Sequence, residues 1–556
     1  MEYFDIDVYS RKITNTSADA QLWFDRGLVW TYSYNHELAL DCYRKALEHD
    51  PECAMAHWGF AYAIGPNYNF EWWMMDPATK EKSLGAAYNH TQSALALADK
   101  VTAPERALIE ALTARYPQQN PIGEQAPWND DFAAAMKAVY ASHPDDIEIA
   151  TVYAESILNQ TPWKMWDIKR NVAAEGAGTA EAQAVLERFT ETAEGQAHPG
   201  ILHLYVHLME MSPTPEKALM AGDCLRELVP DAGHLIHMPT HIDVQCGEYR
   251  DTLHWNLKGI EADLKIAEQQ GRMNFYTAYR IHNYHFAICG ASFLGQYAPA
   301  MAAAVDIVDE IPVELLKAES PPMADFLESY ISTKTHVQIR FGRWRDIIAD
   351  TLPDDPVLYS HTTAVMHYAK AVAHSALGEV AEAEAERANF IAARGRVQES
   401  RYMHNCSCLD LLAIAEQMLD GELEYRKGNH DIAFAHLRKA IELEDGLPYD
   451  EPWGWMQPVR HALGALSLEQ GRIEEAEQAY REDLGLAGDL PRACIHPDNI
   501  WSLKGLDECL TQRGAGDTAE AKMIRQRLML AQSRSDMPVG ASCHCAQAAM
   551  QAVAAE

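Results

Sequence analysis

Basic residues are scarce in this chain. Lys and Arg number 46 against 81 Asp and Glu, which gives a formal net charge of −35 at pH 7. A surface that binds phosphate groups needs an excess of positive charge, so we expect no nucleic-acid partner. The chain also lacks a Walker-type phosphate loop, a dinucleotide glycine fingerprint, a nucleophile elbow and a zincin motif. These absences exclude the enzyme classes that are easiest to identify from sequence.

Long apolar runs are missing as well. No window approaches 18 uninterrupted apolar residues, so we expect no membrane-spanning helix. The first 23 residues have neither a basic start nor an apolar stretch, so no secretory signal is expected and the protein is predicted to be cytoplasmic. Eleven cysteines without a framework spacing fit a reducing compartment. Two pairs, Cys406 with Cys408 and Cys543 with Cys545, are either halves of soft-metal sites or a buried pair and a loose end segment.

The chain does contain a helical repeat. Large, small and aromatic residues and a proline recur at fixed spacing in residues 20–53, namely at Trp23, Gly27, Trp30, Ala39, Tyr43, Ala46 and Pro51. This spacing matches seven of seven positions of the tetratricopeptide repeat, a 34-residue unit of two helices, so the segment resembles that family. Stacked repeats bury a common core. No segment alternates with period two, and we predict an all-α solenoid, a superhelix of tetratricopeptide-like hairpins.

The same pattern recurs with varying fidelity to the end of the chain. Degenerate repeats start near residues 113 and 147 and occupy 199–232, 233–266, 281–314, 328–361 and 364–397, and clear ones lie at 421–440 and 464–483. We predict four regions: 1–145 with aromatic insertions, a histidine-rich centre at 146–361, C-terminal repeats at 362–513, and a helix with a tail at 514–556. Turn-rich aromatic segments interrupt the period at 64–82, 116–131, 159–170, 445–460 and 490–499. They either line a pocket or plug the core.

Histidines concentrate on one face of the central repeats. In tetratricopeptide proteins the first helix of each repeat lines a concave groove through its positions 2, 5, 9 and 12. Eight of the sixteen such positions in four repeats are histidine, namely His203, His207, His234, His237, His241, His282, His285 and His336. With 24 histidines in 556 residues, about one is expected by chance. Spacings of three and four place side chains on one helical face. Two carboxylates, Glu210 and Glu155, occupy further groove positions.

A groove of imidazoles with few carboxylates suits a transition metal. We predict the eight histidines as metal ligands, with copper or iron favoured and zinc possible. His282 and His285 are alternatively acid–base groups, and Glu210 and Glu155 are candidates for bridging the metal or acting as general base. The alternatives are acid–base catalysis without metal, since histidine titrates near neutral pH, and a buried histidine that merely completes a core hydrogen bond.

More narrowly, the chain resembles a group of long bacterial tetratricopeptide proteins with little functional description. The motifs that carry this resemblance are FDRGLVWTYSYNHELAL, CAMAHWGFAYAIGPNYN, HPGILHLYVHLME, GHLIHMPTHI, HNYHF and YDEPWGWMQPVR, between Leu22 and about Arg460. The resemblance supplies no activity. We predict a metal-dependent enzyme, redox or oxygenase before hydrolase, acting on a small molecule or peptide in the groove. The alternatives are a peptide-binding scaffold, with a protein partner on the repeat surface, and metal storage or sensing.

Overall fold

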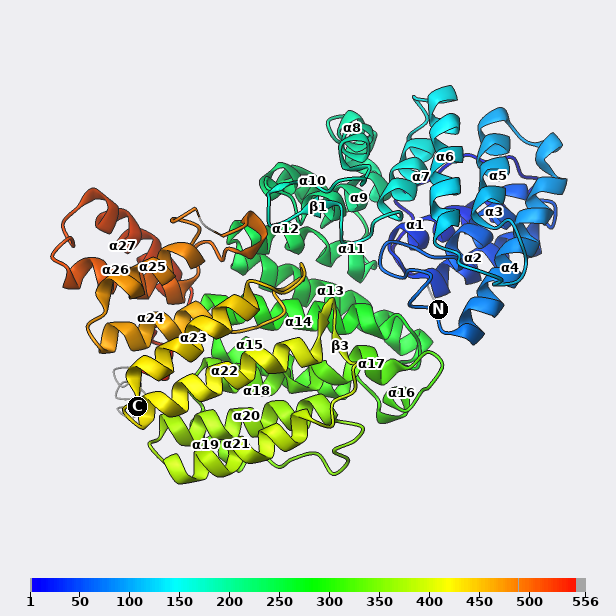
Figure 1. Cartoon of the computed structure of the whole chain (residues 1–556). Helices are drawn as coiled ribbons and strands as arrows, with labels where there is room; N and C mark the ends of the chain where they lie inside the picture. The colour runs from blue at the N-terminus through cyan, green and yellow to red at the C-terminus, as the bar shows by residue number, and fades with distance from the viewer. Residues whose placement is uncertain (1–2, 489, 547–556) are drawn as a thin grey trace. The chain divides into compact units, whose positions relative to one another are not determined.

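The computed structural model describes residues 3–488 and 490–546 as helices joined by loops (Figure 1). The chain divides into two compact units, the first made of Met1–Ile242 with Lys258–Gln270 and the second of Asp243–Leu257 with Gly271–Glu556. The helices α12 (Pro239–Cys246) and α13 (Tyr249–Gln270) contribute to both units. The only strands among the described residues are two short antiparallel hairpins. No described helix has the length and apolarity that crossing a membrane requires.

The first unit contains the N-terminal hairpins. Its helices are α1 (Ala18–Tyr32), α2 (His36–His49), α3 (Ala54–Ile64), α4 (Pro77–Ala96), α5 (Ala103–Arg115), α6 (Pro127–Ser142), α7 (Ile147–Leu158), α8 (Thr179–Thr190), α9 (Pro199–Met209), α10 (Leu219–Leu225) and α11 (Gly233–His237). Short 3-10 turns are η1 (Ala98–Lys100), η2 (Gly195–Ala197) and η3 (Pro215–Ala218). The strands β1 (Trp166–Asp167) and β2 (Val172–Ala173) pair through Trp166 and Ala173.

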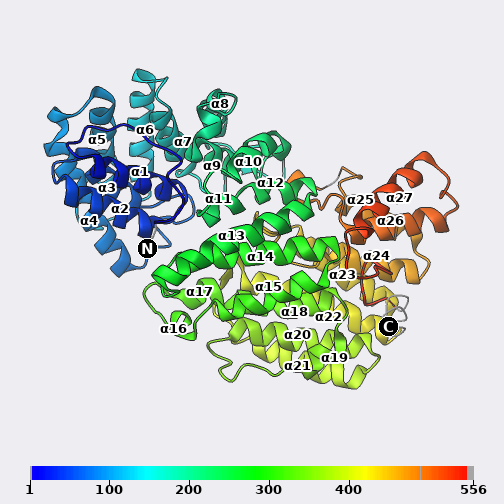
Figure 2. The same cartoon turned by 180° about the vertical axis from the view of Figure 1, so that it is seen from behind.

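The second unit repeats the hairpin arrangement. Its helices are α14 (Thr277–Leu294), α15 (Tyr297–Asp309), α16 (Val313–Leu316), α17 (Met323–Leu327), α18 (Thr333–Arg340), α19 (Trp344–Ala349), α20 (Ser360–Ala376), α21 (Val380–Arg394), α22 (Cys408–Arg426), α23 (His430–Glu444), α24 (Val459–Glu469), α25 (Ile473–Asp483), α26 (Ile500–Gln512) and α27 (Ala519–Gln532). The short elements are η4 (Glu328–Ser332), η5 (Arg492–Cys494), β3 (Tyr402–Met403) and β4 (Cys406–Ser407). Consecutive helices pack in pairs, such as α20 with α21 and α22 with α23 (Figure 2).

Glycines facing a buried tyrosine hold neighbouring hairpins together. A Cβ atom on Gly27 of α1 would lie 2.7 Å from the ring of Tyr43 on α2, and one on Gly59 of α3 would meet the same ring inside the 3.0 Å that real Cβ atoms keep. The second unit packs Tyr480 of α25 against Gly464 and Gly505 in the same way. The close approach confirms the repeat register around Gly27 and Tyr43, and with it the predicted all-α solenoid of tetratricopeptide-like hairpins.

Replacing Gly59 by Ala is therefore expected to destabilise the first unit. The new methyl group has to displace a fully buried ring, and such overpacking costs about 1–3 kcal/mol. Gly85 on α4 is the matched control, because nothing lies within 4 Å of a Cβ built there and Ala is the better helix former by about 1 kcal/mol. Urea unfolding followed by circular dichroism should lower the midpoint for Gly59→Ala and hold or raise it for Gly85→Ala. Equal midpoints for both variants would contradict the register.

Two turns of the predicted repeats are confirmed, and one predicted helix is broken. Gly295 ends α14 in the left-handed conformation at φ 72°, and Gly247 separates α12 from α13 at φ 81°. The repeat at 233–266 was expected to begin with one continuous helix. Instead α11 ends at His237 and α12 begins at Pro239, because proline has no N–H to donate and its ring clashes with the preceding turn.

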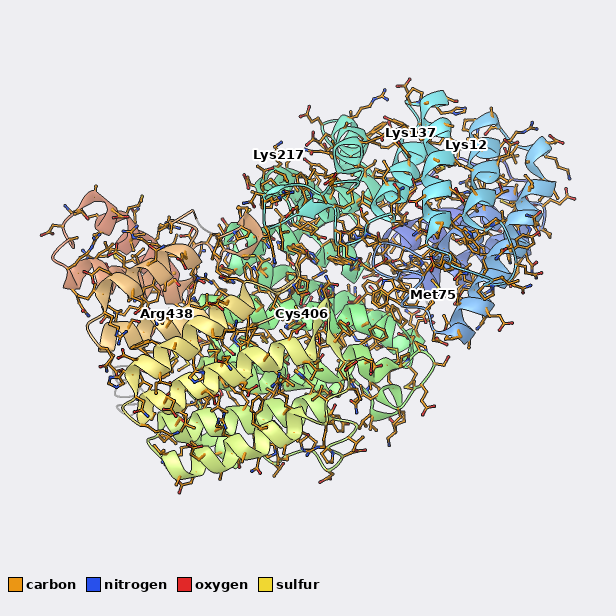
Figure 3. All side chains as sticks on the ribbon, viewed as in Figure 1. Lys12, Met75, Lys137, Lys217, Cys406 and Arg438 are labelled. Atoms are coloured by element: carbon orange, nitrogen blue, oxygen red, sulfur yellow. A yellow bond between two sulfur atoms is a disulfide. The ribbon has the colours of Figure 1, made fainter. Side chains whose placement is uncertain are left out.

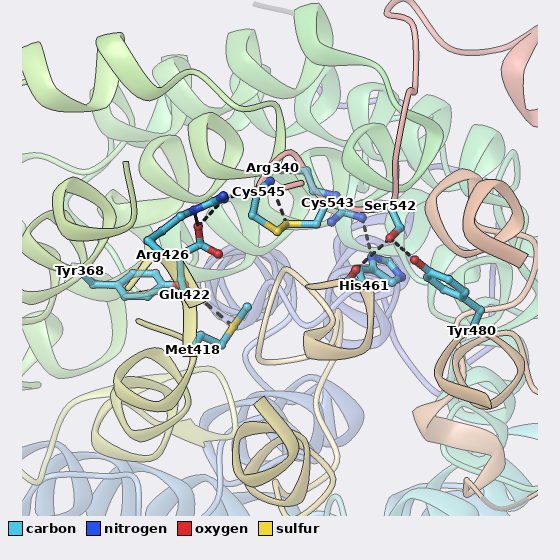
Figure 4. The surroundings of a disulfide bond; sticks show 10 residues. All are labelled: Arg340, Tyr368, Met418, Glu422, Arg426, His461, Tyr480, Ser542, Cys543 and Cys545. Atoms are coloured by element: carbon cyan, nitrogen blue, oxygen red, sulfur yellow. Dashed lines mark hydrogen bonds and ion pairs between the residues drawn. A yellow bond between two sulfur atoms is a disulfide. The ribbon is translucent and has the colours of Figure 1, made fainter. Parts of the chain in front are cut away.

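The C-terminal segment is fixed to the second unit (Figure 4). The sulfur atoms of Cys543 and Cys545 form a disulfide, so this pair is neither a set of metal ligands nor a loose end in this structure. Ser542 Oγ donates to the His461 carbonyl at 2.9 Å and shares a hydrogen bond with the Tyr480 hydroxyl at 2.6 Å. The other pair, Cys406 and Cys408, consists of two buried thiols, as one of the two interpretations expected.

Candidate metal centre

Three histidines of the first unit converge. His203 and His207 lie one turn apart on α9, His234 lies on α11, and none is more than 1% exposed. One ring nitrogen from each lies within 4.8 Å of the other two. The Nε2 atoms of His203 and His234 are 3.2 Å apart, which matches the ~3.3 Å between two nitrogen ligands on a tetrahedral zinc with bonds of about 2.0 Å. These residues therefore fit a metal ion.

Hydrogen bonds on the far side of the rings fix how two of these histidines face the centre. The Nδ1 atom of His203 donates to the Tyr32 carbonyl at 2.6 Å, and that of His207 lies 3.2 Å from Glu210 Oε1. In this tautomer Nε2 carries the lone pair that a metal needs, and such carbonyl and carboxylate partners are typical of metal-bound histidines. Burial lowers the pKa of His203 to about 3, so its ring is neutral at pH 7, as ligation requires.

Glu210 connects two histidines rather than contributing to the group of three. Its Oε1 accepts from His207, and its Oε2 accepts from Nδ1 of His241 at 2.9 Å. The Nε2 atom of His241 lies 2.7 Å from that of His237, which is short for two ligands of one ion and fits an imidazole–imidazole hydrogen bond. Burial raises the pKa of Glu210 well above its usual value. A continuous hydrogen-bonded chain thus runs from His207 through Glu210 and His241 to His237.

Aromatic rings from three loops surround the triad of His203, His207 and His234. The ring of Tyr34 stacks on His207 and His234 at centroid distances of 5.8 and 5.5 Å, and its backbone has a positive φ of 52°. Backbone strain of this kind in a non-glycine residue is common where a side chain has to be placed at a site. The place of Tyr34 beside the histidines could not be predicted from the sequence, because no sequence pattern encodes its φ.

Two aromatic rings that pack on His207 come from segments that interrupt the repeat. Tyr68, in the segment after α3, has its ring 4.6 Å from that of His207. The same segment holds the buried Met75, which is labelled in Figure 3. Trp163, between α7 and β1, has its ring 5.9 Å away. Both segments thus pack on the triad, and the two interpretations, lining a pocket and plugging the core, stay open for them.

The remaining predicted carboxylate of the first unit, Glu155, lies on α7. It is buried, accepts a hydrogen bond from the Tyr62 hydroxyl, and does not belong to the triad. Burial raises its pKa, against the opposing effect of Arg115. The sequence suggested that Glu155 faces a metal ion. In the structure, the charged group that acts on Glu155 is the guanidinium of Arg115.

The last three predicted histidines belong to the second unit. His282 and His285 lie on α14 and His336 on α18. The ring of His285 lies 5.2 Å from that of Tyr330, and Nδ1 of His336 donates to Gln457 Oε1 at 3.2 Å. Burial lowers the pKa of His285 to about 3 and that of His336 to about 4. Five of the eight predicted ligands are therefore in the first unit and three in the second.

The known proteins that are similar to this chain are solved structures with low TM-scores. No family model and no curated protein matches it. Among solved structures, it is similar to a human IFIT1 dimer with m7Gppp-AAAA (11% identity, 86% of this chain and 90% of that one, TM-score 0.31). It is also similar to yeast Tom70 (12% identity, 91% and 92%, TM-score 0.27) and to the Cut9–Hcn1 hetero-tetramer of the APC/C (10% identity, 97% and 97%, TM-score 0.27). Values this low carry no information about function.

Proposed function

We propose that the first unit binds a transition metal ion through His203, His207 and His234 and uses it in catalysis on a small molecule or peptide. The observation that carries the proposal is the convergence of three buried ring nitrogens within 4.8 Å, with the far sides of two rings held by a carbonyl and a carboxylate. Histidines that only complete hydrogen bonds in a core do not need to bring three ring nitrogens this close together. Neutral imidazoles bind copper, iron and zinc.

The number of ligands favours catalysis over a purely structural role. Structural zinc sites use four protein ligands, whereas three protein ligands leave a coordination position for water or substrate. When bound, the ion would supply Lewis-acid or redox chemistry. The protein supplies the rest: Tyr32 and Glu210 orient the imidazoles, Glu210 with His241 and His237 can hold or pass a proton, and the aromatic rings of Tyr34 and Tyr68 exclude water.

Elemental analysis of protein prepared without a histidine tag tests the proposal. We expect close to one equivalent of copper, iron or zinc per chain, or uptake of about one equivalent after removal of metal with a chelator, since a preformed histidine site binds with a large favourable free energy. Less than about 0.2 equivalents, with no uptake on titration, would overturn the proposal and leave the peptide-binding scaffold as the better explanation. Replacement of the exposed His49 by Ala is the control and should change nothing.

A further inference from the structure

A buried guanidinium in the first unit has no acidic partner. Arg115, the last residue of α5, is 1% exposed and lies between the rings of Tyr62 and Phe132, at 4.8 and 5.1 Å. Its Nη2 donates to the carbonyl of Pro66 and the guanidinium also interacts with the Tyr62 hydroxyl, whereas Nη1 has no hydrogen-bond partner within 3.5 Å. Among the described residues no carboxylate lies within 4.0 Å of it, although a charge buried in a protein is normally paired.

The nearest carboxyl group does not fill this role. Glu155 interacts electrostatically with Arg115 but accepts its hydrogen bond from Tyr62. Because burial raises the pKa of Glu155, its negative charge is disfavoured. Glu155 and Arg115 thus attract each other without a direct ion pair, and Nη1 of Arg115 keeps a hydrogen-bonding position open.

Two neutral donors next to Arg115 also lack acceptors. The hydroxyl of Tyr116 and the Nε1–H of Trp72 are buried without a hydrogen-bond partner. The Tyr116 ring lies 5.8 Å from the Arg115 guanidinium carbon. The Trp72 ring lies edge-on to the Tyr116 ring, with the two centroids 6.4 Å apart. One cationic and two neutral donors on neighbouring side chains would suit a ligand that brings oxygen acceptors and a single negative charge. Trp73, which follows Trp72 in the chain, is 68% exposed, so this segment reaches the surface.

The segment after α3 joins these donors to the metal-binding triad. The carbonyl of Pro66 accepts from Arg115, and Tyr68, two residues later, packs its ring on His207. Two residues span at most about 7 Å of extended chain. Between them, Asn67 contacts the half-buried His36 at 3.5 Å, and the ring of His36 lies 5.8 Å from that of Tyr34. A small molecule held at Arg115 would thus lie in the neighbourhood of the triad.

We propose that Arg115, Tyr116 and Trp72 form a carboxylate-binding subsite, and that the substrate of the first unit is therefore a small carboxylic acid. That the acid is a substrate rests on the proposed metal-dependent function, whereas its binding does not require the metal. A planar carboxylate matches the fork of a guanidinium. A phosphate ester, with up to two charges, would require further cations, which the strongly acidic chain does not place here.

Calorimetric titration with matched acid and amide pairs tests the subsite. Acetate and benzoate are compared with acetamide and benzamide, on the whole chain with and without added zinc. We expect each acid to bind at least about 10-fold more tightly than its amide, because only the acid pairs with the guanidinium. Equal affinities for acid and amide, or tighter binding of inorganic phosphate than of either acid, would overturn the proposal.

Three variants assign the preference to these residues. Arg115→Gln should abolish the acid preference, and Arg115→Lys, which keeps the charge but not the fork, should weaken acid binding by about 10-fold. Tyr116→Phe should weaken it several-fold without lowering the unfolding midpoint, since its hydroxyl has no partner to lose. If Arg115→Gln fails to fold, the other two decide: an unchanged acid preference in both refutes the subsite. Acid binding that depends on Arg115 in a chain without metal affinity would sustain the subsite and refute the metal centre, whereas metal binding without acid preference would do the reverse.

Discussion

Acidification from pH 7 to pH 5 is expected to destabilise the second unit. Burial lowers the pKa of five of its histidines to between about 3 and about 4, namely His285, His336, His361, His461 and His544. In the unfolded chain each titrates near 6.5. The unfolded state thus binds more protons below pH 6.5, and the stability present above that pH is lost as the pH falls toward the folded pKa values.

The size of this effect rivals the whole stability of a domain. At pH 5 each such histidine costs about 2 kcal/mol, and a folded domain has only about 5–15 kcal/mol of stability. Three buried carboxyls work in the opposite direction: burial raises the pKa of Glu328 and Glu422 above the usual value and that of Glu444 to about 8. Their contribution to stability is greatest below the unfolded value and declines as the pH rises, so they offset part of the loss from the five imidazoles.

Urea midpoints at pH 7.5, 6.5 and 5.5, measured with chelator present, check this expectation. The midpoint should fall steeply over this range. His361 has no hydrogen-bond partner on either ring nitrogen, so His361→Gln should make the pH dependence shallower by about one group's share without removing a bond. A midpoint that stays constant between pH 7.5 and 5.5 would show that these rings are not buried and neutral.

The repeat register was predictable from sequence because it depends on local periodicity. Gly27 and Tyr43 carry a spacing that only a helical hairpin explains, and the structure packs them together as that spacing requires. The break at Pro239 was predictable too, because proline inside an expected helix signals a boundary. The expectation of one continuous helix there was wrong. The disulfide joins Cys543 and Cys545, which are two residues apart and lie after the last repeat, so no repeat pattern describes it.

The candidate site was predictable in part for the same reason. His203 and His207 share a face by spacing alone, and the adjoining repeat supplies His234. The identity of their hydrogen-bond partners was not predictable, because Glu210 reaches His241 across 31 residues. Arg115 lies at the end of a helix and Tyr34 in a turn, both outside any groove position, so helical periodicity could not identify them. Whether His237, His241, His282, His285 and His336 bind a metal stays a prediction.

Replacing His234 by Ala is expected to abolish tight metal binding, and the neighbouring variants should form a graded series. His234 supplies one of the three converging nitrogens, so its loss leaves two ligands and should weaken zinc or copper binding by more than 100-fold. Glu210→Gln keeps all three but leaves a single acceptor oxygen where two carboxyl oxygens pair with His207 and His241, and loss of such an outer partner typically costs 10–100-fold. His237, joined to Glu210 only through His241, should matter least of these.

Competition titrations with a chromophoric chelator measure the series on whole chains whose circular dichroism matches the parent protein. The order His234→Ala, then Glu210→Gln, then His237→Ala, from the largest loss to the smallest, follows from the distance of each group to the converging nitrogens. A His237→Ala protein that loses as much affinity as His234→Ala would place the ion between His237 and His241 instead, where the 2.7 Å separation of the Nε2 atoms would then have to widen. Retention of full affinity by His234→Ala would exclude the triad as the metal site.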